Sequence, residues 1–240
     1  MGHGWEGAVL KLLRGKDFTL TVTGAEYVTE HYLRVHFTDG GLLAAAGTHP
    51  TMWVRVWFSR SGRPHQRAYT LVDPDPAAGT FSLEFALHPG AAGDWARSAR
   101  PGDTIDATLQ GTAFTAPDPL PAQLLVVGDT ASLPAVNSLL DAFGPIPATV
   151  WLETRHASDE RLAVRADPVR HDVRRVPRER AGARLVEEVG SALPGLVKDP
   201  SGVYVWIACD TVTTRALAAR ARSVLTAPRR QIHALGYWRP

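Results

Sequence analysis

Three short segments combine residue types that can bind a phosphorylated, planar cofactor. The first is Arg67-Ala68-Tyr69-Thr70, which supplies a guanidinium, an aromatic ring and a hydroxyl within four residues. A guanidinium forms charge-assisted hydrogen bonds with a pyrophosphate, and a tyrosine ring can pack on a flat ring system. A strand that begins here and carries one exposed arginine has the same sequence. The segment alone therefore leaves both interpretations open.

The second segment runs from His88 to Trp95, through Pro-Gly-Ala-Ala-Gly-Asp. A predicted strand ends here, small residues follow, and a helix begins. Backbone N–H groups at a helix start can bind an anion, and small side chains let a phosphate approach. An ordinary strand-to-helix turn has the same pattern, so this segment is also ambiguous by itself.

The third segment is a buried-strand run, Leu124–Val127, followed by Gly128-Asp129-Thr130-Ala131-Ser132 and a predicted helix. A glycine and hydroxyl residues at the carboxyl end of a parallel strand indicate a nucleotide-phosphate crevice. The GxGxxG fingerprint of dinucleotide sites is absent.

The elements that must position these segments differ between the two halves of the chain. Five runs alternate in polarity and predict strands of a six-stranded antiparallel barrel; they span 18–23, 32–37, 52–58, 80–88 and 103–109. A short helix is expected at 94–99, before Pro101-Gly102. Arg67 should lie where one barrel strand begins.

Three prolines within residues 116–121 mark a boundary between the halves. Beyond it, strands predicted at 124–127, 148–153 and 204–209 alternate with helices predicted at 133–143 and 211–225. Such alternation predicts a doubly wound parallel sheet. We therefore expect two domains, an antiparallel β-barrel over 1–116 and an α/β domain over 117–240.

Composition excludes several classes of protein. The 240 residues are 45% hydrophobic and 21% charged, as in globular domains. The single Cys209 precludes an internal disulfide, and the nine histidines show no metal-ligand spacing. A net charge of +2, without aromatic residues among the basic ones, argues against nucleic acid. No run is long enough for a membrane span and no signal peptide is evident, so we expect a cytoplasmic monomer.

In this order, the three segments resemble the siderophore-interacting protein family, flavin reductases within the ferredoxin-reductase-like superfamily. Pro101-Gly102-Asp103, Leu133-Pro134-Ala135 and the terminal Gly236-Tyr-Trp-Arg239 also match, so the resemblance covers about residues 17 to 239. Residues 50–53, 66–70 and 128–132 look especially like the cytoplasmic reductase domain of some mycobacterial siderophore ABC transporters. We expect a free-standing version of that domain.

The resemblance implies FAD in the barrel and NADPH or NADH as the electron donor, with ferredoxin as an alternative donor. Hydride would pass from NAD(P)H to flavin N5, and single electrons would then reduce Fe(III) in a ferric siderophore and release Fe(II). No catalytic side chain and no metal ligand is implied. By motif, the barrel contacts with FAD would be Arg67, Ala68, Tyr69, Thr70, Glu84, Ala86, Leu87, His88, Ala92, Gly93 and Asp94. The nucleotide crevice would be Gly128, Asp129, Thr130, Ala131 and Ser132, and Tyr237 and Trp238 would lie near the flavin.

The chain departs from the family pattern at three places. Gly93-Asp94 stands where Ser or Thr is common, Val72 where a second arginine is common, and Cys209-Asp210 where Gly-Glu is common. A carboxylate beside a pyrophosphate opposes binding unless it points away, so we expect weakened FAD affinity. Cys209 either faces the nicotinamide or packs in the core.

Two features leave alternatives open. Seven arginines within 165–184 form either a solvated face or a site for an NADPH 2′-phosphate or an anionic siderophore; they are Arg165, Arg170, Arg174, Arg175, Arg178, Arg180 and Arg184. The fold does not fix the substrate, so a general NAD(P)H:flavin or quinone reductase and a non-catalytic siderophore or flavin carrier are the competing functions.

Overall fold

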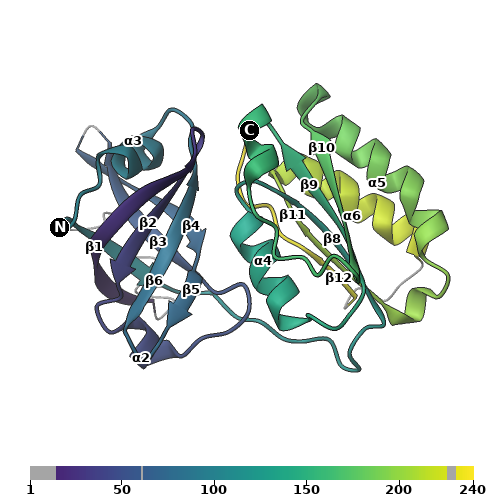
Figure 1. The fold of residues 1–240 in the computed structure, drawn as a ribbon, viewed down its shortest axis with the longest axis horizontal. Helices are drawn as coiled ribbons and strands as arrows, with labels where there is room; N and C mark the ends of the chain where they lie inside the picture. Colours follow the sequence, from purple (N-terminus) through teal and green to yellow (C-terminus); the bar gives the residue numbers. More distant parts are fainter. Residues whose placement is uncertain (1–14, 61, 226–230) are drawn as a thin grey trace. The chain divides into compact units, whose positions relative to one another are not determined.

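A computed structural model describes residues 15–60, 62–225 and 231–240 (Figure 1). The chain divides into two compact units, with the boundary between Phe114 and Thr115.

The first unit is built on one antiparallel sheet in the order β4-β3-β7-β1-β2-β6-β5. Two short helices, α2 (Leu42–Ala46) and α3 (Ala91–Ser98), lie at opposite ends of this sheet (Figure 1). The strands are β1 (Lys16–Thr29), β2 (Tyr32–Thr38), β3 (Trp53–Arg60), β4 (Arg63–Thr70), β5 (Val72–Asp75), β6 (Thr80–Ala86) and β7 (Thr104–Leu109).

Period-2 alternation determines which side chains enter the core of this unit. Leu33 on β2 lies opposite Phe85 on β6, and Phe37 lies opposite Phe81. All four side chains are at most 2% exposed. Because successive side chains on a strand point to opposite faces, Val35 and Leu83 share this core face, whereas Arg34 and Glu84 lie on the outer face, where they pair across the strands.

The predicted antiparallel architecture is confirmed, but the sheet has seven strands rather than six. The whole of 63–70 is a strand, so Arg67–Thr70 ends β4 and does not begin a strand. Its sequence does not alternate clearly because β4 is an edge strand that pairs only with β3 and needs no continuous apolar face.

The second unit is a parallel sheet in the order β10-β9-β8-β11-β12. Helix α4 (Leu133–Ala142) covers one face, and α5 (Ala183–Leu196) and α6 (Thr211–Leu225) cover the other (Figure 1). The strands are β8 (Gln123–Asp129), β9 (Ala148–Thr154), β10 (His171–Pro177), β11 (Val203–Ala208) and β12 (Ile232–Ala234), with short 3-10 turns at Ala157–Arg161, Arg180–Gly182 and Pro200–Gly202.

The doubly wound architecture is as predicted, although β10 and α5 were missed. Strand β10 lies at the edge of the sheet and carries Arg174 and Arg175, which hid its pattern. The connections reverse direction between the adjacent strands β8 and β11, and ligands of such sheets bind at the carboxyl ends of strands at this switch point. None of the described helices has the length and apolar composition of a membrane span.

Candidate functional site

The end of the edge strand β4 presents a charged group and an unsatisfied hydroxyl. The guanidinium of Arg67 is exposed and donates one hydrogen bond, to the carbonyl of Gln66 (2.7 Å). Thr70 is only 5% exposed, yet its Oγ1 has no hydrogen-bond partner among the described residues. A buried polar atom without a partner is costly and is often completed by a ligand.

Aromatic packing joins this strand to the start of α3. The ring of Tyr69 lies 4.5 Å from that of Phe85, and Trp95 of α3 lies 6.0 Å from Phe85. Burial raises the pKa of the Tyr69 hydroxyl far above its usual value, so the group stays neutral. The first two sequence segments are therefore held on the same part of the barrel by Phe85, a residue that the sequence analysis did not single out.

In the turn into α3, the backbone at Gly93 lies close to the backbone carbonyl of His88. A Cβ on Gly93 would lie 2.4 Å from the carbonyl oxygen of His88, so only glycine fits without a shift. No side chain caps the start of α3. The Asp94 side chain is 72% exposed and its Oδ1 lies 3.3 Å from Arg97 Nη1. The carboxylate is thus turned along the helix, the condition under which it does not oppose an anion at the helix start.

The side chains of Glu84 and His88 already have partners within the first unit, so their expected contacts with a flavin, mainly through backbone and packing, stay a prediction. Tyr32 donates to Glu84 Oε2 (2.9 Å), and Arg34 donates to Oε1, so this carboxylate is satisfied on the face opposite the barrel core. The His88 ring is exposed, with Nδ1 2.9 Å from the carbonyl of Pro89. Ala86 is half-buried, and Leu87 and Ala92 are buried and pack in the core.

Side chains in the loop after β8 accept hydrogen bonds from the backbone N–H groups of the same loop, just before α4. Asp129 Oδ1 accepts hydrogen bonds from the backbone N–H groups of Ala131 and Ser132, each at 3.0 Å. Ser132 Oγ accepts from the Asp129 N–H (2.9 Å). The carboxylate of Asp129 therefore occupies the position that a phosphate takes at many helix starts. The predicted crevice residues lie together. The side chains of Asp129 and Ser132 bond to backbone groups of this loop, and among the five residues only Ala131 is exposed.

Gly128 serves packing rather than an open crevice. A Cβ at this position would lie 2.8 Å from Ser132 Oγ and 2.8 Å from Val136 Cγ2. The glycine lets α4 lie close against β8, which is one of the roles of glycine where a strand leads into a helix.

Three buried carboxylates gather at the carboxyl edge of the parallel sheet. Glu153 ends β9, Asp129 ends β8, and Asp210 follows β11; they are 2%, 5% and 0% exposed. Arg178 forms a short ion pair with Glu153 and donates to Asp210 Oδ2 at 3.1 Å. Burial raises the pKa of Glu153, whose Oε1 has no partner in the described part of the chain. The described residues contain no group of side chains placed to hold a metal ion.

The C-terminal segment closes over this edge. Trp238 Nε1 donates to Asp129 Oδ2 (2.7 Å), and the indole lies between the guanidinium groups of Arg155 (4.5 Å) and Arg178 (5.1 Å). The Tyr237 N–H donates to the carbonyl of Cys209 (2.8 Å). Within the second unit, both predicted aromatic residues thus lie at the switch point; their proximity to a flavin stays a prediction.

Cys209 packs in the core. Its side chain is fully buried, and burial together with the nearby carboxylates raises the pKa of the thiol well above its usual value. Of the two alternatives for this residue, the structure supports the packed thiol.

The seven arginines of 165–184 do not form a free cationic site. Each lies within 4.0 Å of a carboxylate. Most of them pair on a solvated face, but Arg178 is largely buried, with 11% of its side chain exposed. The ion pairs are Arg165–Asp141, Arg170–Asp167, Arg174–Asp172, Arg175–Glu160, Arg178 with Glu153 and Asp210, Arg180–Glu187, and Arg184 with Glu179 and Glu188.

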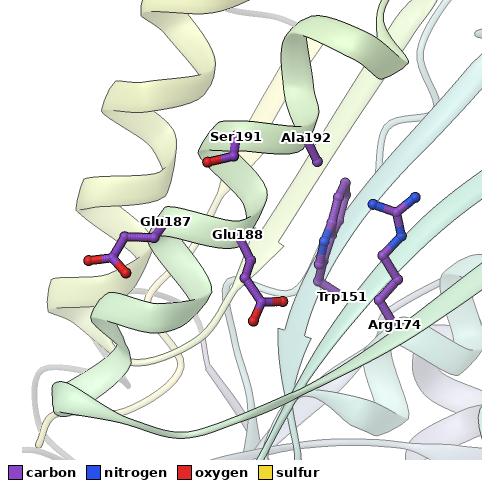
Figure 2. A pocket seen from close by; sticks show the side chains of 6 residues that line it. All are labelled: Trp151, Arg174, Glu187, Glu188, Ser191 and Ala192. Atoms are coloured by element: carbon purple, nitrogen blue, oxygen red, sulfur yellow. The ribbon is translucent and has the colours of Figure 1, made fainter.

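A pocket of about 450 Å³ lies beside α5, away from the carboxyl edge of the sheet (Figure 2). Arg174 lies over the ring of Trp151 at 5.3 Å, with Glu187 and Glu188 across from it. These charges already have partners in Asp172, Arg180 and Arg184, so none of the charged side chains that line the pocket is unpaired.

Sequence reasoning missed Glu153 and Arg155, and it named Arg178 only as part of the arginine-rich segment 165–184. The signal was available, because each of them ends or closely follows a parallel strand, and the rule applied to Gly128–Ser132 applies to these strand ends as well.

Family models match both units. Residues 18–111 match the siderophore-interacting FAD-binding domain, and residues 121–240 match the siderophore-interacting protein model. The chain belongs to the siderophore-interacting protein family. Its expected resemblance to the mycobacterial reductase domain is confirmed by 33% identity over 248 residues to the mycobactin import ATP-binding/permease protein IrtA of Mycolicibacterium thermoresistibile. The match takes in 99% of this chain and 26% of that protein, so the chain spans about a quarter of this relative's length.

Solved structures show the same fold. The siderophore-interacting protein SipS of Aeromonas hydrophila superposes with a TM-score of 0.79 at 21% identity, covering 94% of this chain and 92% of SipS. A ferredoxin NADP+ reductase from Neisseria gonorrhoeae with bound FAD and NADP gives a TM-score of 0.67 at 15% identity, covering 87% and 92%.

The packing of Gly128 predicts that a larger residue there destabilises the second unit. Gly128→Val should lower the free energy of unfolding by about 1–3 kcal/mol, because the new side chain overlaps Ser132 and Val136. Urea denaturation measures this loss. Gly144→Ala is the control, since its Cβ would meet nothing closer than 3.8 Å. A fully stable Gly128→Val variant would restore the interpretation of this glycine as part of an open crevice.

The raised pKa of Glu153 predicts a pH-dependent effect of removing it. The folded protein holds the Glu153 proton more firmly than the unfolded chain, so this stabilisation is present at low pH and is lost as the pH rises through the folded pKa. The stability of Glu153→Gln relative to wild type should therefore increase from about pH 4 to about pH 7. Thermal or urea unfolding across this range measures the trend, with Glu160→Gln as the matched control; a decreasing trend would contradict the assignment.

Proposed function

We propose that this protein is a flavin-dependent reductase of ferric siderophores, with FAD on the first unit and NAD(P)H as the electron donor. The observation that carries the proposal is the buried hydroxyl of Thr70, which has no partner among the described residues, at the end of the strand that also carries the exposed Arg67, in a unit that matches an FAD-binding family model. FAD would supply the conversion of a two-electron hydride donor into single electrons for Fe(III).

The residues of the first unit fit FAD in chemical type. Arg67 has no carboxylate partner in the described structure and can bind a pyrophosphate with parallel N–H donors. Thr70 can complete its hydrogen bonding on a ring edge. Tyr69, neutral and fixed by Phe85, provides a flat surface for a ring system. The uncapped start of α3 can receive a second phosphate oxygen.

The nicotinamide nucleotide would approach the carboxyl ends of β8 and β11. Asp129 already accepts the Ala131 and Ser132 N–H groups in the turn before α4, so a nucleotide phosphate would not bind to these two groups. Trp238 also lies at this edge, with the guanidinium groups of Arg155 and Arg178 against its ring.

The siderophore substrate is supported by the family and by relatives named for mycobactin import. The test is anaerobic stopped-flow of the FAD-loaded protein with NADH, NADPH or reduced ferredoxin, followed by ferric mycobactin and a chelator that reports Fe(II). We expect flavin bleaching by a nicotinamide donor and faster reoxidation by the ferric complex than by a quinone or free flavin. Faster reoxidation by quinone would favour a general reductase, and no bleaching with any donor would favour a carrier.

Two substitutions test the flavin site by binding alone. Arg67→Ala should weaken FAD binding by about 1.5–3 kcal/mol, and Thr70→Val by about 0.5–1.5 kcal/mol, the ranges for charged and neutral hydrogen bonds. Thr70→Val should leave the FAD-free protein at least as stable as wild type, because it removes an unsatisfied hydroxyl.

Fluorescence titration of FAD measures both affinities. Arg63→Ala, which removes an equal charge from the other end of β4, is the matched control and should leave FAD affinity within about twofold. Equal losses in Arg63→Ala and Arg67→Ala would reject a specific pyrophosphate contact.

A further inference from the structure

Helix α6 carries positive charge without compensation. Its residues Thr211–Leu225 include Arg215, Arg220 and Arg222 and contain no Asp or Glu. Arg215 and Arg222 are exposed, and within the described residues neither forms an ion pair or a hydrogen bond through its guanidinium. They differ in this from the seven arginines of 165–184, each of which has a carboxylate within reach.

These two arginines lie along one groove. Arg215 and Arg222 are seven residues apart, two helical turns, so they share a face of α6. With Thr211 and Ala218 of the helix and Gly236 of the C-terminal segment, they line a pocket of about 340 Å³. No acidic residue lines it. A Cβ on Gly236 would lie 2.6 Å from Thr211 Cγ2, so the segment lies close against the start of the helix and forms one wall.

The neighbouring positions that ordinarily attract phosphate are already taken. Asp129 accepts the N–H groups of Ala131 and Ser132 just before α4, and Asp210 accepts those of Val212 and Thr213 at the start of α6, the latter two at 2.9 Å. An anion at this end of the sheet meets buried carboxylates at both helix starts. The uncompensated guanidinium groups are in the groove, which begins at Thr211, directly after Asp210.

We propose that this groove is a binding site for a phosphate-bearing small molecule, held by Arg215 and Arg222. Each guanidinium offers two parallel N–H donors to a phosphate, so two of them along one groove suit a diphosphate. Thr214 also lines the pocket, and its hydroxyl accepts from the Cys209 N–H (3.1 Å), which leaves its own proton to donate. The volume is at the lower end of small-molecule sites. The site is independent of the flavin chemistry proposed above.

Isothermal titration calorimetry of the full chain at about 0.15 M ionic strength, where the Debye length is about 8 Å, tests the site, with pyrophosphate and ADP as probes. Arg215→Gln and Arg222→Gln should each weaken binding about tenfold or more, as expected for a lost charged hydrogen bond. Arg220→Gln on the same helix is the matched control: it removes the same charge, but its side chain lies against Gly190 of α5, outside the groove. It should change affinity less than about twofold, since only the net charge differs.

The outcomes separate the site from general charge attraction. Tighter binding of ADP than of pyrophosphate supports a nucleotide ligand, and equal binding supports a free polyphosphate; both bear out a phosphate site. No binding of either probe, or equal weakening by Arg220→Gln and Arg215→Gln, overturns it. Unchanged melting temperatures of the variants, measured by circular dichroism, show that any loss of binding reflects the groove and not unfolding.

Discussion

One guanidinium, that of Arg178, compensates carboxylates from two strands that flank β8. Arg178 pairs with Glu153 at the end of β9 and with Asp210 after β11. All three groups are largely removed from solvent, so the attraction must offset several kcal/mol of desolvation for each charge. Such an arrangement tolerates few neighbours, because any further anion adds repulsion where water cannot screen it. The shape and charge of the parallel sheet's carboxyl edge follow from this constraint.

Two aspartates at the same edge accept hydrogen bonds from backbone N–H groups near the starts of helices α4 and α6. Asp129 satisfies two backbone N–H groups in the turn that leads into α4, and Asp210 satisfies two at the start of α6, so α6 begins without an external anion. Trp238 completes the arrangement by donating to Asp129 across more than a hundred residues of sequence. The second unit therefore has the architecture of a dinucleotide-binding sheet, but carboxylates of its own occupy backbone N–H groups near the helix starts. Arg215 and Arg222, which have no carboxylate partner among the described residues, lie instead on the exposed face of α6.

The sequence predicted the elements with strong periodicity and missed those at sheet edges. The runs around Val35, Leu83 and Val126 are buried and alternate or continue in apolar character, which identifies them without ambiguity. Strands β4 and β10 are edge strands rich in arginine, so no apolar period marks them. Residue type and position identified the residues of the candidate sites but not their partners. The pairing of Arg178 with Glu153 and the packing of Gly128 on Val136 depend on how strands and helices are placed in space, which local sequence does not encode.

The edge position of β4 has a consequence for the cellular fate of the chain. An open strand edge is a template for pairing with another copy, and charged residues and proline on that edge are the usual protection. β4 carries Arg63, Pro64 and Arg67, so the strand that offers its end to a cofactor also resists self-association. Before a cofactor binds, Arg67 would therefore oppose aggregation of the chain through this edge, and the same side chain would later bind the cofactor. Substitution of Arg67 would then affect solubility as well as binding.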